Sequence, residues 1–301
     1  MTFRIEEVTS RTQADVLRLM REVYGRAMSE AEFEWFFDSN PLGSRIISVA
    51  ETDGRVVGVA AMTFGRALVG GQERRVAFAV HAATHPSARG AGIFSRLELH
   101  NEERAAEEGA ELALGFTNPM AGPILVRRLG WRDLYRMRIW ARPLRRRGPE
   151  TSAGSRIERF TDEHARAWRA VQPRWENCLV RDIAYLNWRY AAAPRDYRAF
   201  GSQSGYAVVG YTVRGRISVA VVCDLVAAPR EQRELLQRCL GEARGAATAA
   251  IAVPAPGQHR AYLSLGFLPT PRTIRVIVKP LRAGANPAGR WHFSLGDTDF
   301  L

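Results

Sequence analysis

The chain has 301 residues, 46% of them hydrophobic and 25% charged, a balance that is normal for a soluble globular protein. No stretch approaches the roughly 18 apolar residues of a membrane-spanning helix, and the acidic start MTFRIEEVTSRTQ lacks the apolar core of a secretion signal. The formal net charge of +12 favours anionic partners such as a phosphorylated cofactor, an acidic carrier protein or nucleic acid. Because Lys279 is the only lysine, we attribute part of this charge to a coding bias toward arginine.

The three cysteines, Cys178, Cys223 and Cys239, have neither the spacing of a metal site nor the pattern of a disulfide framework. We therefore predict isolated thiols in a cytoplasmic protein that holds no metal.

The first half of the chain predicts alternating strands and helices. In order, the pattern gives a strand at 2–8, an amphipathic helix at 11–24, a hairpin over 44–68, a strand at 73–85, a helix at 93–108, a buried strand at 110–118, a short helix at 122–131 and a closing strand at 132–144. Asp53-Gly54 is a strong turn signal inside the hairpin. Gly130 is expected to end the short helix.

The second half repeats this order after a Gly-, Pro- and Ser-rich linker at 144–155. Trp35 and Trp188 each precede an aromatic residue by two positions and a proline by six. The offset between the copies is 153 residues at these tryptophans and 136 at Gly130 and Gly266, so the second copy lacks about 17 residues in its middle. We infer a duplication with domains at 1–143 and 156–281, followed by a tail at 282–301.

The stretch AVHAATHPSARGAGIFSRLELH, residues 79–100, joins a strand to a helix through an arginine-led, glycine-rich turn. Such a turn aims backbone N–H groups at one point next to the positive end of a helix, where a pyrophosphate can bind. A simple tight turn would have the same composition, and by itself the pattern leaves both interpretations open.

The segments THPSARGAGIFSRL and LGFTNPMAGPILVRRLGW together resemble the GNAT superfamily of acyl-CoA N-acyltransferases. The signature of that family is Arg/Gln-x-x-Gly-x-Gly/Ala, and Arg89, Gly92 and Phe94 fall on its three defined positions. Phe94 is a departure, because Gly or Ala is usual there. The closing WHFSLGDTDFL is similar to the tail of tandem members of the family, and the resemblance covers both halves. Only the first half carries the signature, so the C-terminal copy is identified as degenerate.

The resemblance implies an α/β (α+β) fold with two tandem domains, each a mixed, mostly antiparallel sheet flanked by helices. It also implies that acyl-CoA, most simply acetyl-CoA, binds between the fourth and fifth strands of the first domain. The implied cofactor residues are Ala82, Ala83 and Thr84 for the pantetheine arm, and Arg89, Gly90, Ala91, Gly92, Ile93 and Phe94 for the pyrophosphate. The Ala82 amide would polarise the thioester carbonyl. Asn118 would hold the pantetheine arm or cap the next helix.

The catalytic residues are less well defined by the resemblance. Relatives often use a tyrosine four residues before the glycine of the Leu-Gly-Phe/Trp motif to protonate the leaving thiolate. This position is Val126 in the first copy and Tyr262 in the second, where Tyr262 is either a core residue or an acid that reaches the other copy. The positions of the general base hold Phe78 and Val80. His81 is the nearest titratable group, either as a base or substrate contact or as a structural residue; His85 is expected to be structural.

Three functions remain open at this point. The first is direct acyl transfer from coenzyme A to a primary amine of a small molecule. The second is transfer from an acyl carrier protein docked on an arginine-rich surface, formed by Arg127, Arg128, Arg132, Arg136 and Arg138. The third is a catalytically inactive acyl-CoA-binding protein. Nucleic-acid binding through the cluster at 145–147 has no supporting motif.

Overall fold

A computed structural model describes residues 2–25, 28–43, 45–144 and 156–298. The chain divides into two compact units, made of residues 1–67, 72–135 and 275–288 in unit 1, and of 68–71, 136–274 and 289–301 in unit 2. Each unit has a mixed, mostly antiparallel sheet with helices beside it, which confirms the predicted fold class.

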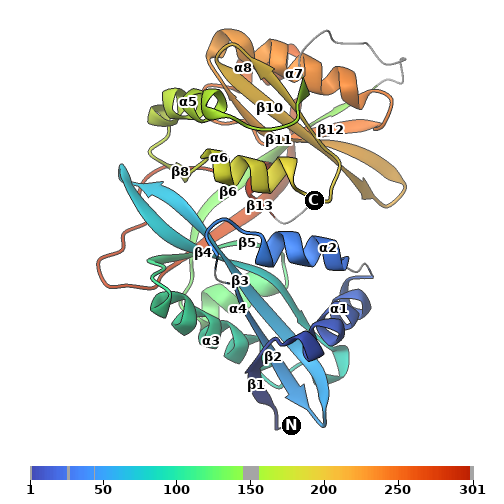
Figure 1. The fold of residues 1–301 in the computed structure, drawn as a ribbon, viewed down its shortest axis with the longest axis vertical. Coiled ribbons are helices and arrows are strands. Elements are labelled where there is room, and N and C mark those ends of the chain that lie inside the picture. Colours follow the sequence, from blue (N-terminus) through green and yellow to red (C-terminus); the bar gives the residue numbers. More distant parts are fainter. Residues whose placement is uncertain (1, 26–27, 44, 145–155, 299–301) are drawn as a thin grey trace. The chain divides into compact units, whose positions relative to one another are not determined.

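Unit 1 begins with a strand and two helices before its main strands (Figure 1). Its elements are β1 (Arg4–Glu7), α1 (Ser10–Tyr24), α2 (Glu30–Phe33), the π-helical turn η1 (Glu34–Asp38), β2 (Ile46–Thr52), β3 (Arg55–Val69), β4 (Gln72–Thr84), the 3₁₀ turn η2 (Pro86–Ala88), α3 (Ile93–Glu107), β5 (Leu112–Thr117) and α4 (Ala121–Arg128). The sheet order is β1-β2-β3-β4-β5, with β4 and β5 parallel. Figure 1 shows α1 and α2 on one side of these strands and α3 on the other.

Local sequence explains the ends of these elements. Thr9 and Thr12 form a reciprocal capping box at the start of α1, and Gly25 ends the helix in a left-handed conformation. Asp53 and Gly54 both have positive φ, at 49° and 72°, as a two-residue hairpin turn requires. The predicted strands and helices of this half are therefore confirmed, with boundaries within a few residues.

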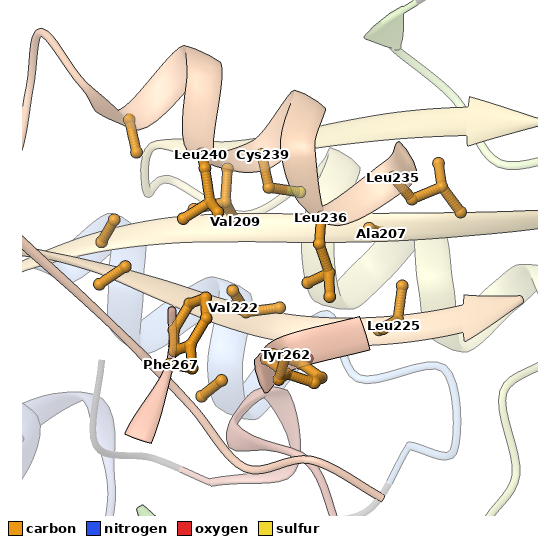
Figure 2. Packing of buried hydrophobic residues seen from close by; sticks show 14 of the residues in the cluster. Ala207, Val209, Val222, Leu225, Leu235, Leu236, Cys239, Leu240, Tyr262 and Phe267 are labelled. Atoms are coloured by element: carbon orange, nitrogen blue, oxygen red, sulfur yellow. The ribbon is translucent and has the colours of Figure 1, made fainter. Parts of the chain in front are cut away.

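Unit 2 repeats the order of unit 1. Its elements are β7 (Arg156–Ile157), α5 (Asp162–Val171), η3 (Gln172–Arg174), β8 (Asn177–Leu179), α6 (Ile183–Leu186), η4 (Asn187–Ala191), β9 (Tyr197–Ser202), β10 (Gly205–Arg214), β11 (Ile217–Ala227), α7 (Pro229–Ala243), β12 (Ala249–Ala252), α8 (His259–Ser264), β14 (Trp291–His292) and η5 (Leu295–Asp297). The sheet order is β7-β9-β10-β11-β12, and β11 pairs parallel to β12 as β4 does to β5. In Figure 2, α7 covers β10 and β11 with Leu235, Leu236, Cys239 and Leu240.

Each half of the sequence contributes the later part of its last strand to the unit formed mainly by the other half. The later part of β6 (Arg132–Pro143) pairs with β12 in unit 2, and the later part of β13 (Leu268–Pro280) pairs with β5 in unit 1. Two sheets with the same strand order present similar edges, so each can accept the strand of the other. The compact units therefore differ from the predicted boundaries at 143 and 281. Of the predicted linker at 144–155, residues 145–155 lie outside the described residues.

The C-terminal tail is anchored in the core of unit 2 by two buried arginines. Arg181 donates to Asp224 at 2.6 Å and to both Asp297 carboxylate oxygens at 2.9 and 3.0 Å. Arg189 donates to the carbonyl oxygens of Gly296 and Thr298, both at 2.8 Å. Because Arg181 is fully buried, its charge depends on the two carboxylates, and they depend on it.

Replacing Arg181 with methionine leaves Asp224 and Asp297 buried without their cation. We expect the Arg181→Met variant to lose about 3–5 kcal/mol of unfolding free energy, measured by urea denaturation. The matched control is Arg290→Met, which removes an ion pair to Glu176 from a side chain that is 87% exposed and should change stability by less than about 1 kcal/mol. Equal losses in the two variants would contradict the anchoring role.

A second buried polar cluster lies on the inner face of α3. Glu98, Asn101 and Glu102 are each less than 5% exposed. Glu102 accepts from Trp131 Nε1 at 2.6 Å and pairs with Lys279, which comes from the exchanged C-terminal segment. Burial, and then the neighbouring Glu102 carboxylate, raise the pKa of Glu98 to about 8, while Lys279 acts in the opposite direction. Glu98 is therefore protonated in the folded chain at neutral pH.

The raised pKa makes stability fall as pH rises. An unfolded glutamate loses its proton near pH 4.5, whereas folded Glu98 keeps its proton until about pH 8, so increasing pH across this window favours the unfolded state. We expect the Glu98→Gln variant to lack this slope and to exceed the wild type in stability at pH 8 by on the order of a few kcal/mol. Urea unfolding from pH 5 to 8.5 measures it, with the exposed Glu103→Gln as control. Parallel pH profiles of wild type and Glu98→Gln would refute the assignment.

Candidate functional site

The parallel pairing of β4 with β5 is short. It runs over four residue pairs, from Val76 opposite Leu112 to Ala79 opposite Gly115. Beyond these pairs β4 continues to Thr84 and β5 to Thr117 without further pairing to each other. The later part of β4 therefore presents backbone groups at an edge where another hydrogen-bonding partner can be added.

His81 lies just after the last pair and distorts β4. Its φ is +46°, in the left-handed region that a histidine rarely adopts. The imidazole packs edge-on against Phe36 and Phe37, with ring centroids 5.1 and 5.8 Å apart. Non-glycine residues in this region are strained, and such residues gather at functional sites. His81 is thus a half-buried titratable group at the point where the two strands separate.

The edge of β4 after His81 is contacted by two side chains. The Tyr24 hydroxyl donates to the Ala82 carbonyl oxygen, and Arg89 Nε donates to the Thr84 carbonyl oxygen at 3.4 Å. Ala83 is buried, whereas its neighbours Ala82 and Thr84 are partly exposed. Sequence reasoning missed the contribution of Tyr24, because the pairing joins residues 58 positions apart and leaves no local pattern.

The glycine-rich turn follows at the start of α3. Gly90 and Gly92 have φ values of 84° and 76°, and a Cβ atom at either position would meet nothing within 4 Å. Gly92 caps the 15-residue helix without a side-chain hydrogen bond. Within the described residues, no amide from Gly90 to Ser95 donates a hydrogen bond. A row of exposed N–H groups at the positive end of a helix is a site for an anion, and phosphate is the usual one.

Gly58 of β3 lets α3 approach the sheet. A Cβ at this position would lie 2.4 Å from Ile93 Cγ2 and 3.3 Å from Leu97 Cδ1. Real side chains cannot approach so closely, so glycine here fixes how near the first turn of α3 lies to the strands. The close approach fixes the N-terminus of α3 beside the end of β4.

Unit 2 closes the equivalent site with its own residues. The connection from β11 to α7 is the single residue Ala228, and Pro229 removes one N–H group from the first turn. The copy offset is 153 residues between the starts of η1 and η4, 143 between the ends of β4 and β11, and 136 between the starts of α3 and α7. Seven of the missing residues therefore belong to the glycine-rich turn.

The edge of β11 in unit 2 is buried, and a side chain of unit 2 bonds one of its carbonyl oxygens. The buried Gln258 side chain donates to the Leu225 carbonyl oxygen at 2.8 Å and accepts from the Ala255 amide at 3.0 Å. At the offset of the strand ends, Asp224 corresponds to His81, and Asp224 is held by Arg181. The matching carbonyl oxygen in unit 1, that of Ala82, also accepts from a side chain, but there Ala82 is partly exposed whereas Leu225 is buried. Unit 2 therefore lacks the glycine-rich turn of unit 1 and buries the matching strand edge.

A comparison with protein families matches the part of the chain that holds these residues. Residues 4–133 match the family described as the acetyltransferase (GNAT) domain. We refer to this matched segment, residues 4–133, as the GNAT domain. A search of curated proteins returned no significant relative.

Solved structures resemble the chain over nearly its whole length. They include a GCN5-related N-acetyltransferase from Kribbella flavida (18% identity, TM-score 0.64, 93% of this chain and 71% of that one). A second GCN5-related N-acetyltransferase comes from Anabaena variabilis (14%, TM-score 0.66, 93% and 73%). A probable N-acyltransferase from Enterococcus faecalis has 13% identity, a TM-score of 0.63 and coverage of 93% and 73%. At these identities the likeness shows the fold alone.

The remaining predicted residues of the GNAT domain are placed as follows. Asn118 Oδ1 accepts from the amides of Met120 and Ala121, both at 2.9 Å, and so caps the start of α4. His85 Nδ1 contacts Ser87 Oγ at 2.6 Å and accepts from the Ser87 amide, which fits its expected structural role. Val126 is half-buried beside the core of unit 1.

Tyr262 lies in the core of unit 2. Its side chain is 2% exposed, packs against Phe267 with ring centroids 5.2 Å apart, and is surrounded by apolar residues (Figure 2). Burial raises the pKa of its phenol well above the usual value. Of the two interpretations made from the sequence, the core role is the one that this position favours.

The remaining predictions concern the cysteines, the surface arginines, a metal site and a membrane-spanning helix. The three thiols are buried without disulfides, and burial raises the pKa of Cys178 to about 11 and that of Cys223 to about 12. Arg127, Arg128 and Arg132 are exposed in unit 1, whereas the exposed Arg136 and Arg138 belong to unit 2. Among the described residues there is no cluster of three metal-ligating side chains, and no helix has the length and apolar character to cross a membrane.

The close approach at Gly58 gives a test of how α3 is positioned. We expect Gly58→Ala to destabilise the chain by about 1–3 kcal/mol, because the added methyl group overlaps Ile93. Thermal and urea unfolding measure the change. The control is Gly245→Ala, where a Cβ meets nothing within 4 Å, and its effect should stay within about 0.5 kcal/mol. A neutral Gly58→Ala would show that the first turn of α3 can move away from β3.

Proposed function

We propose that the chain is an N-acyltransferase that moves an acyl group, most simply acetyl, from coenzyme A to a primary amine of a small molecule. The observation that carries the proposal is the coincidence, in the GNAT domain, of an interrupted β4–β5 pairing with a row of amides at the start of α3 that donate no hydrogen bond within the described residues. Unit 2 repeats the fold but lacks the glycine-rich turn and buries the matching strand edge, which makes it an internal comparison.

The residues of unit 1 fit the chemical parts of acyl-CoA. The amides of Gly90 to Phe94 suit the pyrophosphate, and Arg89, which is exposed beside them, adds a full positive charge. The peptide-like pantetheine arm suits the edge of β4 from Ala82 to Thr84, because its amides can pair as an added strand would. The space above Gly90 and Gly92 lets a ligand approach the backbone closely.

The reaction needs an electrophile, a neutral amine and a leaving thiol. The Ala82 amide would donate to the thioester carbonyl as negative charge develops on its oxygen. The amine nitrogen attacks the carbonyl carbon directly, and the carbon–sulfur bond breaks. His81 is a half-buried imidazole next to Ala82 in sequence, and we assign it contact with the amine or the removal of its proton. A solvent-relayed proton transfer would serve an amine that arrives neutral.

Calorimetric titration of acetyl-CoA into the full chain tests the proposal. We expect one binding event in the wild type and a loss of affinity of at least about tenfold in Arg89→Ala/Gly92→Trp, because a charged hydrogen bond is lost and the indole fills the space beside the amides. The matched control is Arg230→Ala, since Arg230 is an exposed arginine at the start of α7 in unit 2. It should bind as the wild type does.

The other outcomes separate the alternative functions. Absence of binding by the wild type would overturn the coenzyme A proposal and favour an acyl carrier protein as donor, docked through the exposed arginines of the GNAT domain. Binding without release of thiol over a broad amine panel would favour an inactive acyl-CoA-binding protein.

A further inference from the structure

Tyr24 is placed at the proposed acyl end of the site. It is the last residue of α1, its side chain is 51% exposed, and its hydroxyl donates to the Ala82 carbonyl oxygen. The N–H and C=O groups of one residue in an extended strand point to the same edge. The phenol therefore lies on the edge that carries the Ala82 amide, which the proposed function assigns to the thioester carbonyl.

The contact with Ala82 is compatible with a bound ligand. A carbonyl oxygen has two lone pairs, so Ala82 can accept from Tyr24 and from an amide of the pantetheine arm at the same time. Tyr24 is also exposed enough to meet a small molecule that enters along this edge. No rearrangement of α1 is required for the phenol to remain beside the site.

Only one tyrosine of unit 1, among the described residues, is placed as a candidate proton donor at the edge of β4. All eight lie among the described residues, and six of them belong to unit 2. Tyr135 of unit 1 lies on β6, and burial raises the pKa of its phenol. The corresponding position on α4 is Val126, which carries no proton. Tyr24 is the tyrosine of unit 1 that contacts the edge of β4.

We propose that Tyr24 supplies the proton that the thiol of coenzyme A takes up as it leaves. This inference rests on the proposed function. The amine nitrogen forms a bond to the acyl carbon, the carbon–sulfur bond breaks, and its electron pair goes to sulfur. Sulfur takes the proton of the Tyr24 hydroxyl. The phenolate then recovers a proton that the amine nitrogen has lost, directly or through water, so the products are an amide and a neutral thiol. A phenol is an effective donor to a thiolate of similar pKa.

The acidity of the leaving group provides a test that a merely structural role would not affect. Turnover is measured for acetyl-CoA and for its selenium analogue, with the amine that the wild type acylates fastest from a panel. A selenol is far more acidic than a thiol and leaves without a proton. We expect Tyr24→Phe to lose about 100-fold in kcat with acetyl-CoA and less than about threefold with the selenium analogue.

The controls separate this inference from the proposed function. Tyr135→Phe removes a phenol of the same unit and should retain wild-type rates with both donors. Calorimetry should give Tyr24→Phe an affinity for acetyl-CoA within a few-fold of the wild type. Failure of the wild type to bind acetyl-CoA would overturn the proposed function itself.

Three results would overturn the role of Tyr24 while leaving coenzyme A binding intact. The first is an equal loss of rate with both donors, which a structural role predicts. The second is an unchanged rate in Tyr24→Phe. The third is a wild type that binds acetyl-CoA but releases no thiol with any amine, because no leaving thiolate would then exist.

Discussion

The early end of a parallel strand pair is the constraint on which the rest of this protein depends. A strand whose neighbour stops pairing exposes N–H and C=O groups, and each must find another partner or remain in water. Both copies of the fold meet this problem, since β4–β5 pairs over four residues and β11–β12 over three. In unit 2 the buried Gln258 bonds this edge, whereas in unit 1 the contacts come from Tyr24 and Arg89, which are exposed.

Under the proposed function, the two copies divide stability and ligand binding between them. The strand-to-helix connection that holds the glycine-rich turn of unit 1 is seven residues longer than the matching connection of the second copy. Where unit 1 has His81, unit 2 has Asp224, bound to Arg181 and through it to the C-terminal tail. The same fold position is strained and half-buried in one copy and buried in an ion pair with Arg181 in the other. The exchange of β6 and β13 makes each unit depend on residues from the other half of the sequence.

Most elements could be predicted from the sequence because their signals are local. Periodicity located the strands, Asp53-Gly54 located a turn, and the paired tryptophans marked two equivalent segments of the repeat, which the structure forms as π-helical turns. The exchanged strands could not be predicted, because the copies have similar patterns and either partner satisfies each edge. The same limit applies to the Tyr24–Ala82 and Gln258–Leu225 hydrogen bonds, which join residues 58 and 33 positions apart through side chains with no periodic pattern.

At the candidate site, the sequence predicted the glycine-rich turn better than the catalytic groups. Arg89, Gly90 and Gly92 suggested an anion site, and the left-handed backbone of the two glycines, with amides that donate no hydrogen bond, has the geometry that such a site needs. The catalytic groups were harder, because the expected tyrosine position holds Val126 and the matching Tyr262 is buried in the core of unit 2. Proton transfer depends on which side chains meet in space, and a spacing rule carried over from relatives does not supply that.

The most direct measurement is a crystal structure of the full chain grown with acetyl-CoA. The account predicts one coenzyme A molecule per chain, with its pyrophosphate on the amides of Gly90 to Phe94 and its pantetheine arm along Ala82 to Thr84. No coenzyme A is expected at the start of α7. A molecule bound at unit 2, or a pyrophosphate held away from the glycine-rich turn, would contradict the division of roles between the two copies.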